Sequence, residues 1–123
     1  MKIEVSIGEI IDKLTILEIK KNNINNLEKL NNINKEFKYL HDITFKKLKI
    51  NQDDYNKLFE INKELWEIED DIRNKERIKE FDSNFIALAR KVYYTNDKRA
   101  NLKKELNLKY NSNLIEEKSY AKY

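Results

Sequence analysis

The sequence predicts an all-α protein, an antiparallel up-down four-helix bundle with a short C-terminal tail. It contains one Gly and no Pro, so residues that make hairpins and tight turns are almost absent. Apolar residues recur at spacings of three and four, the period of an amphipathic helix. Four such stretches are joined by short polar junctions, which favour antiparallel neighbours. A chain of 123 residues suffices for one core but not for two ordinary domains, so 1–123 is expected to form a single helical domain.

The first helix is expected over residues 7–23. Ser6 and Glu9 match a capping box, in which each side chain satisfies the backbone N–H of the other residue. One face collects most of the apolar residues: Ile7, Ile10, Ile11, Leu14 and Leu17. Ile16 and Ile19 lie well off that face. This helix should therefore be largely surrounded by the others, or should contact a second chain.

The second helix is expected over residues 26–47, with Asn25 as its cap. Its apolar positions follow a three-four alternation close to a packed heptad seam: Leu30, Ile33, Phe37, Leu40 and Thr44. The single histidine, His41, lies beside this seam. A lone histidine in such a place is usually a partly exposed helix residue.

Two longer helices complete the bundle. The third is expected over 52–79, capped by Asn51, and the fourth over 83–110, capped by Asp82. Residues 112–123 form a tail whose few apolar side chains favour packing across the bundle.

Composition excludes several classes of protein. The chain has no Cys and one His, which removes disulfides, thiolate ligands and metal sites that need two imidazoles. No apolar run approaches the roughly 18 residues of a membrane span, and no signal peptide is recognisable, so we expect a cytoplasmic protein without membrane partners.

Net charge is −4 over 52–80 and +4 over 81–111, which predicts that the third and fourth helices pack together. Nucleic acid is not an expected partner, because no one-signed basic stripe is present.

Polar residues occupy positions where the bundle should have a core. Asn62, Glu69 and Arg73 fall on the apolar face of the third helix, and charges in such positions are costly unless they are paired. In an antiparallel bundle, residues equally far in sequence from the loop that joins two helices lie at the same level. Counting outward from the expected loops places polar residues of three helices in or near one layer. The predicted ligand-binding residues are Glu18, Glu69, Arg73, Tyr93, Asn96, Arg99 and Lys103.

This set has two interpretations, a structural ion-pair network or a pocket for a polar, partly anionic small molecule. No metal ligand or cofactor is assigned, and whether the chain is an enzyme is left open. One alternative is a Mg²⁺-dependent pyrophosphohydrolase of nucleotides or nucleotide sugars, with Glu69 or Glu67 as ligand and Asp97 assisting. A chorismate-mutase-like site is a further alternative. The last is a structural homodimer joined through exposed Ile16 and Ile19.

Five segments carry a resemblance to a known family: residues 5–20, 65–73, 88–93, 95–100 and 116–120. In these segments the chain resembles a family of small bacterial and phage proteins classified as a domain of unknown function. The resemblance implies no catalytic residues. It does imply a link to surface-glycan biosynthesis, because members are sometimes encoded near, or fused to, glycosyltransferase-like proteins.

Overall fold

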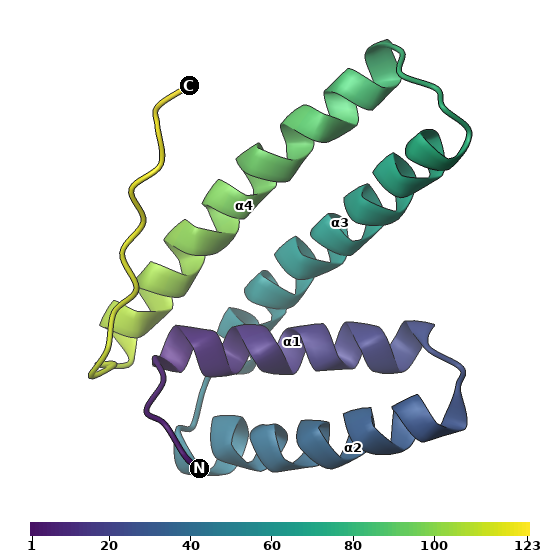
Figure 1. The fold of residues 1–123 in the computed structure, drawn as a ribbon. Coiled ribbons are helices and arrows are strands. Elements are labelled where there is room, and N and C mark those ends of the chain that lie inside the picture. The colour runs from purple at the N-terminus through teal and green to yellow at the C-terminus, as the bar shows by residue number, and fades with distance from the viewer.

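The computed structural model describes residues 1–123 and contains helices but no strands. Its elements are α1 (Ile7–Asn23), α2 (Leu27–Asp42), the π-helical segment η1 (Ile43–Lys47), α3 (Gln52–Arg77) and α4 (Ser83–Lys109). Helices α1 and α2 form one antiparallel pair, and α3 and α4 form a second that crosses the first at an angle (Figure 1). The predicted all-α antiparallel architecture is confirmed.

Helix starts follow the predicted cap chemistry with two exceptions. The side chains of three predicted caps accept a backbone N–H of the first turn: Ser6, Asn51 and Asp82. The prediction for α2 was wrong by one residue, because Asn26 rather than Asn25 accepts from the backbone N–H of Lys29. The capping box is also one-sided. The Glu9 carboxylate pairs with Lys103 of α4 at 2.8 Å, so an ionic partner replaces the expected backbone N–H.

The C-terminal end of α2 widens into η1, where the prediction had one continuous helix. Lys49 then adopts a left-handed backbone with φ of 53°, and the Ile50 N–H closes the turn on the Thr44 carbonyl at 3.0 Å. Thr44 itself is fully buried, and its hydroxyl has no hydrogen-bond partner. The turn therefore places a polar group in the core without satisfying it.

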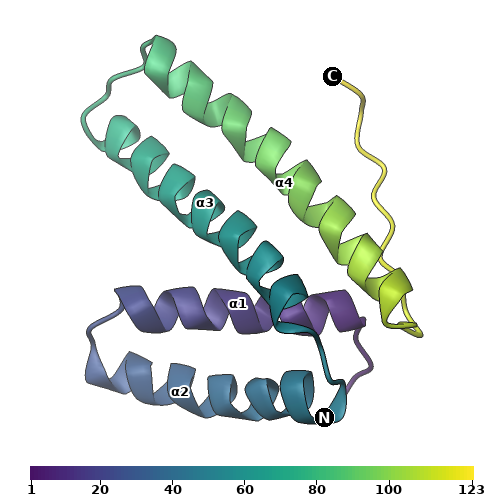
Figure 2. The same ribbon diagram turned by 180° about the vertical axis from the view of Figure 1, so that it is seen from behind.

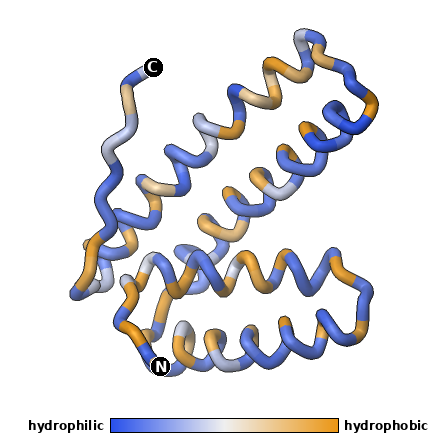
Figure 3. Tube along the Cα trace, in the orientation of Figure 1, coloured by the Kyte–Doolittle hydropathy of each residue, from blue (hydrophilic) through white to orange (hydrophobic).

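The core lies where the two helix pairs cross. It consists of buried side chains from α1, the turn before α3, α3 itself and α4: Ile11, Leu14, Ile50, Tyr55, Leu58 and Leu106. Hydrophobic positions recur along the helices between hydrophilic ones, as amphipathic helices require (Figure 3). Away from the crossing, the pairs diverge (Figure 2). Side chains of α1, α3 and α4 beyond the core therefore border a hollow rather than a closed interior.

Helices α3 and α4 pack against each other along their length, as their opposite net charges predicted. Ion pairs join them at both ends. Lys109 contacts Asp54 at 2.7 Å, and Lys75 contacts Asp82 at 3.2 Å. These pairs fix the antiparallel register, so the middle of α4 faces the middle of α3.

A close approach at Gly8 brings α1 onto α4. The Gly8 N–H donates to the Asn107 side-chain oxygen at 2.6 Å. A Cβ atom at Gly8 would lie 2.8 Å from the Lys103 carbonyl oxygen, too close for any larger residue without movement. The absence of a side chain thus lets the first turns of α1 carry their carboxylates to the cations of α4.

The tail after α4 contains no regular structure and runs back beside that helix (Figures 1 and 2). It is attached near its start, where the Ser112 hydroxyl accepts the Ile7 N–H at 3.0 Å, and at its end, where Tyr123 reaches Asp97. None of the helices has the length and apolar character needed to cross a membrane.

Candidate functional site

An ion pair between Asp12 of α1 and Arg99 of α4 forms the centre of the candidate site. The guanidinium is bidentate: Nε donates to Oδ1 at 2.9 Å and Nη2 donates to Oδ2 at 2.5 Å. Asn62 of α3 donates to the same carboxylate at 2.8 Å. The Asp12 side chain is only 2% exposed, so three helices meet at one buried charge.

Lys103 of α4 extends this centre toward the tail. Its Nζ lies 2.8 Å from Glu9, 3.7 Å from Asp12 and 3.4 Å from Glu116. Glu116 belongs to the tail and also contacts Lys118 at 2.5 Å. The resulting ionic centre contains three cations and three carboxylates: Arg99, Lys103, Lys118, Glu9, Asp12 and Glu116.

Burial and pairing act in opposite directions on the carboxyl of Asp12. Burial alone would raise its pKa, but hydrogen bonds from Arg99 and Asn62, together with the charges of Arg99 and Lys103, hold the pKa below its usual range. The hydrogen bond to Asp12 raises the pKa of Arg99 in turn. Asp12 and Arg99 therefore stay charged across the physiological range, and neither is suited to proton transfer near neutral pH.

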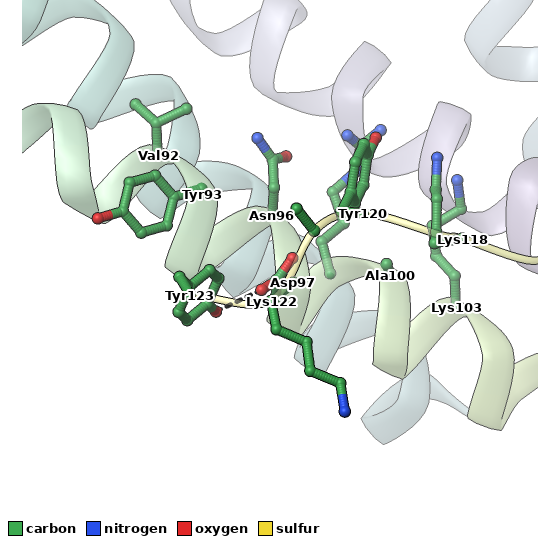
Figure 4. Close-up of a pocket in the computed structure, with 12 residues that line it drawn as sticks. Val92, Tyr93, Asn96, Asp97, Ala100, Lys103, Lys118, Tyr120, Lys122 and Tyr123 are labelled. Atoms are coloured by element: carbon green, nitrogen blue, oxygen red, sulfur yellow. Dashed lines mark hydrogen bonds between the residues drawn. The ribbon is translucent and has the colours of Figure 1, made fainter.

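A hollow of about 760 Å³, which we call the tail hollow, lies between α4 and the tail. Arg99, Lys103 and Lys118 contribute their cationic groups to its wall, and Figure 4 shows Lys103 and Lys118 pointing the same way. The Lys122 ammonium points away from them (Figure 4). The rest of the wall is mostly aromatic, amide or small: Val92, Tyr93, Asn96, Asp97, Ala100, Tyr120, Ala121 and Tyr123.

Tyrosine rings close one end of the tail hollow. Tyr123 packs against Tyr93 and Tyr94, with ring centroids 5.1 and 4.8 Å apart. Its hydroxyl donates to Asp97, and this hydrogen bond raises the pKa of Tyr123 to about 12 (Figure 4). The last residue of the tail is thus held by both tilted and edge-on ring contacts and a charge-assisted hydrogen bond.

A second hollow of about 650 Å³, the helix hollow, lies where the helix pairs diverge. Its wall includes side chains of α1, α3 and α4: Ile16, Ile19, Asn62, Leu65, Trp66, Glu69, Asp70, Arg73, Asn96 and Arg99. Glu69 and Arg73 pair within it at 3.2 Å, although the Arg73 side chain is 79% exposed. Asn96 and Arg99 line both hollows, so the two share a wall on α4.

The predicted site residues lie in the helix hollow, in the tail hollow, or, for Glu18, in neither. The helix hollow takes Glu69 and Arg73, the tail hollow takes Tyr93 and Lys103, and both take Asn96 and Arg99. Glu18 lines neither hollow, and its predicted convergence with Glu69 was wrong. Its carboxylate instead accepts the hydroxyl of Tyr55 at 2.7 Å, and burial and this contact raise the pKa of Tyr55.

The orientation of α1 explains the misplaced glutamate. Ile16 and Ile19 face the helix hollow, and neighbouring residues on a helix point about 100° apart, so Glu18 is turned aside. Tyr55 also lies 14 residues before Glu69, about 21 Å along the helix. The exposure expected of Ile19 was likewise wrong, since Ile19 is only 3% exposed and packs inside the molecule, whereas Ile16 is half-buried.

Asp12, the most buried charge of the site, was missed by the sequence reasoning, as were the carboxylates of Glu9 and Glu116. The spacing in the sequence could have indicated that Asp12 points inward, because it precedes Ile16 by four residues and Ile19 by seven. It therefore belongs to a second inward face of α1, the face occupied by the isoleucines. A helix packed on two sides needs two inward faces, and α1 does contact α2, α3 and α4.

The acidic residues named for a metal-dependent reaction are not gathered. No group of three or more His, Cys, Asp or Glu side chains has the arrangement needed to hold a metal ion. Glu67 and Glu69 are exposed on α3, and Asp97 is engaged by Tyr123.

The fold and site define a small all-α protein in which a buried ion pair separates two polar hollows. Its sequence matches the model of a "Family of unknown function (DUF6165)" over residues 1–123. The chain belongs to that family. Comparison with curated proteins and with solved structures gave no match.

Proposed function

We propose that this protein is a cytoplasmic accessory module that binds a polar, partly anionic small molecule in the tail hollow. The observation that carries the proposal is the wall of that hollow, where three cationic side chains lie beside tyrosine rings and one side-chain amide. Its volume of about 760 Å³ falls within the usual range of small-molecule sites.

The chemistry of the wall supports a ligand with a ring and a negative charge. Tyr93 and Tyr120 offer ring faces for a flat or cyclic group. The side-chain amide of Asn96 also lines the hollow and can both donate and accept. Arg99 uses two of its five N–H groups on Asp12, so three remain for a ligand. The site thus combines shape, stacking surface and unused donors.

The resemblance to glycosyltransferase-associated bacterial and phage proteins adds a context for this ligand. We propose that the module serves surface-glycan biosynthesis, and nucleotide sugars are therefore the first ligands to test. They contain a ring system and a diphosphate, which match the two kinds of group on the wall. Neither the metal-dependent hydrolase nor the homodimer is favoured by a specific contact, so we retain neither as a second candidate.

The test is a binding panel of nucleotide sugars, nucleotides and free sugars, measured by thermal shift and by calorimetry. A ligand that binds the folded state raises the melting temperature by mass action. The double variant Lys118→Gln, Tyr120→Ala removes one cation and one ring from the wall and should weaken binding at least tenfold. The matched control is Lys98→Gln, an exposed lysine of α4 outside both hollows. Unchanged affinity in the double variant, or no binding by any compound, refutes the proposal.

Trp66 is the only tryptophan, and it lines the helix hollow rather than the tail hollow. Its fluorescence therefore reports whether a bound ligand extends past Asn96 and Arg99 into the second space. A ligand confined to the tail hollow should leave the emission of Trp66 unchanged.

A further inference from the structure

The tail places its own carboxylate on the cations of the tail hollow. Glu116 contacts Lys103 at 3.4 Å with one oxygen and Lys118 at 2.5 Å with the other. The hydrogen bond from Lys118 and the charge of Lys103 hold the pKa of Glu116 below its usual range. In the free protein a carboxylate that does not itself line the hollow is therefore already paired with two cations of its wall.

Charge balance determines what can replace that group. With Glu116 in place, the three cations of the ionic centre face three carboxylates, so an added anion would find no uncompensated partner among them. Asp12 is buried on α1 and Glu9 is fixed in its first turn. The side chains of Glu9 and Glu116 are similarly exposed, 46% and 40%, but only Glu116 lies on a segment without regular structure. Its backbone is the least constrained of the three, so Glu116 is the carboxylate expected to leave.

We propose that the ligand of the tail hollow carries a phosphoryl group, which displaces the Glu116 carboxylate from Lys103 and Lys118 while the rest of the tail stays in place. This inference rests on the proposed function and specifies its ligand class. The two carboxylate oxygens of Glu116 engage two cations, whereas the three oxygens of a phosphoryl group match Arg99 as well. Arg99 retains unused N–H groups at the same wall.

The neighbouring Glu117 provides a matched control. It pairs with Lys104 at 2.9 Å, and neither residue lines the tail hollow. Glu116→Gln and Glu117→Gln therefore remove the same charge from adjacent positions of the tail, but only the first removes the internal competitor.

Inorganic pyrophosphate is the probe, titrated into the full chain by calorimetry at constant ionic strength, with malonate as the carboxylate comparison. Glu116→Gln should bind pyrophosphate roughly fivefold more tightly than the unmodified chain, because the exposed ion pairs that compete with the probe are lost. Glu117→Gln should bind as the unmodified chain does. Equal affinity in both variants overturns the displacement, and malonate binding as tightly as pyrophosphate overturns the phosphoryl assignment.

Displacement of Glu116 is measured separately by NMR of the unmodified chain. The side-chain carboxyl signal of Glu116 should shift on addition of pyrophosphate, whereas that of Glu117 should stay in place. A Glu116 carboxyl signal that does not move with saturating probe overturns the displacement. If a nucleotide sugar binds but Glu116→Gln has no effect, this inference fails alone. If nothing in the panel or the pyrophosphate titration binds, the proposed function fails as well.

Discussion

Replacing Asp12 by Asn tests whether the buried ion pair holds the first helix on the fourth. The substitution keeps the shape of the side chain and removes its charge. Arg99 then loses both of its carboxylate contacts, at 2.9 and 2.5 Å, and Lys103 loses a charge 3.7 Å away. The amide oxygen can still accept hydrogen bonds from Arg99 Nε and Asn62, as Oδ1 of Asp12 does, but two cations are left without their buried counter-charge.

Breaking a buried pair by removing one partner costs about 3–5 kcal/mol. Arg99 remains 29% exposed and can recover part of its hydration, so we expect the low end, about 3 kcal/mol. For a chain of this length the melting temperature should fall by roughly 10 °C. Urea unfolding followed by circular dichroism gives the free energy of unfolding, and calorimetry gives the melting temperature.

Asp42→Asn is the matched control. Asp42 pairs with Lys46 at 3.4 Å, and both side chains are well exposed, so its loss should cost less than about 0.5 kcal/mol. If Asp12→Asn destabilises the protein no more than Asp42→Asn does, the ion pair does not hold the helices together, and the reasoning about the site is wrong.

Three further predictions follow from buried polar contacts. The pKa of Asp12 is lowered in the folded state, so its contribution to the free energy of unfolding is complete above its ordinary pKa of about 4 and is lost as pH falls through the folded value. The free energy of unfolding should therefore decline in acid, and less steeply in Asp12→Asn. Gly8→Ala should destabilise by about 1–3 kcal/mol in urea, since its Cβ meets the Lys103 carbonyl at 2.8 Å; unchanged stability would show that α1 can shift freely. Thr44→Val should raise the unfolding free energy by about 1 kcal/mol, because it removes a buried hydroxyl without a partner, and a loss of stability there would indicate an unseen hydrogen bond.

Local chemistry in the sequence determined the helices of this protein. Ser6, Asn51 and Asp82 accept first-turn N–H groups because short polar side chains compete well for unsatisfied donors at a helix start. The shift from Asn25 to Asn26 shows the limit, since adjacent asparagines offer the same chemistry. The antiparallel register of α3 and α4 was also readable, because a short loop fixes which residues lie level.

The arrangement of the two helix pairs was decided by the tertiary structure. Residue spacing gives the faces of a helix but not the angle at which one pair crosses another, and that angle turned Glu18 to Tyr55 and Ile19 toward the helix hollow. The contact between Glu116 and Lys103 was likewise invisible, because a tail without periodicity carries no information on its direction. Helix formation depends on near neighbours in the chain, whereas this site depends on contacts between residues as far apart as Glu9 and Lys103.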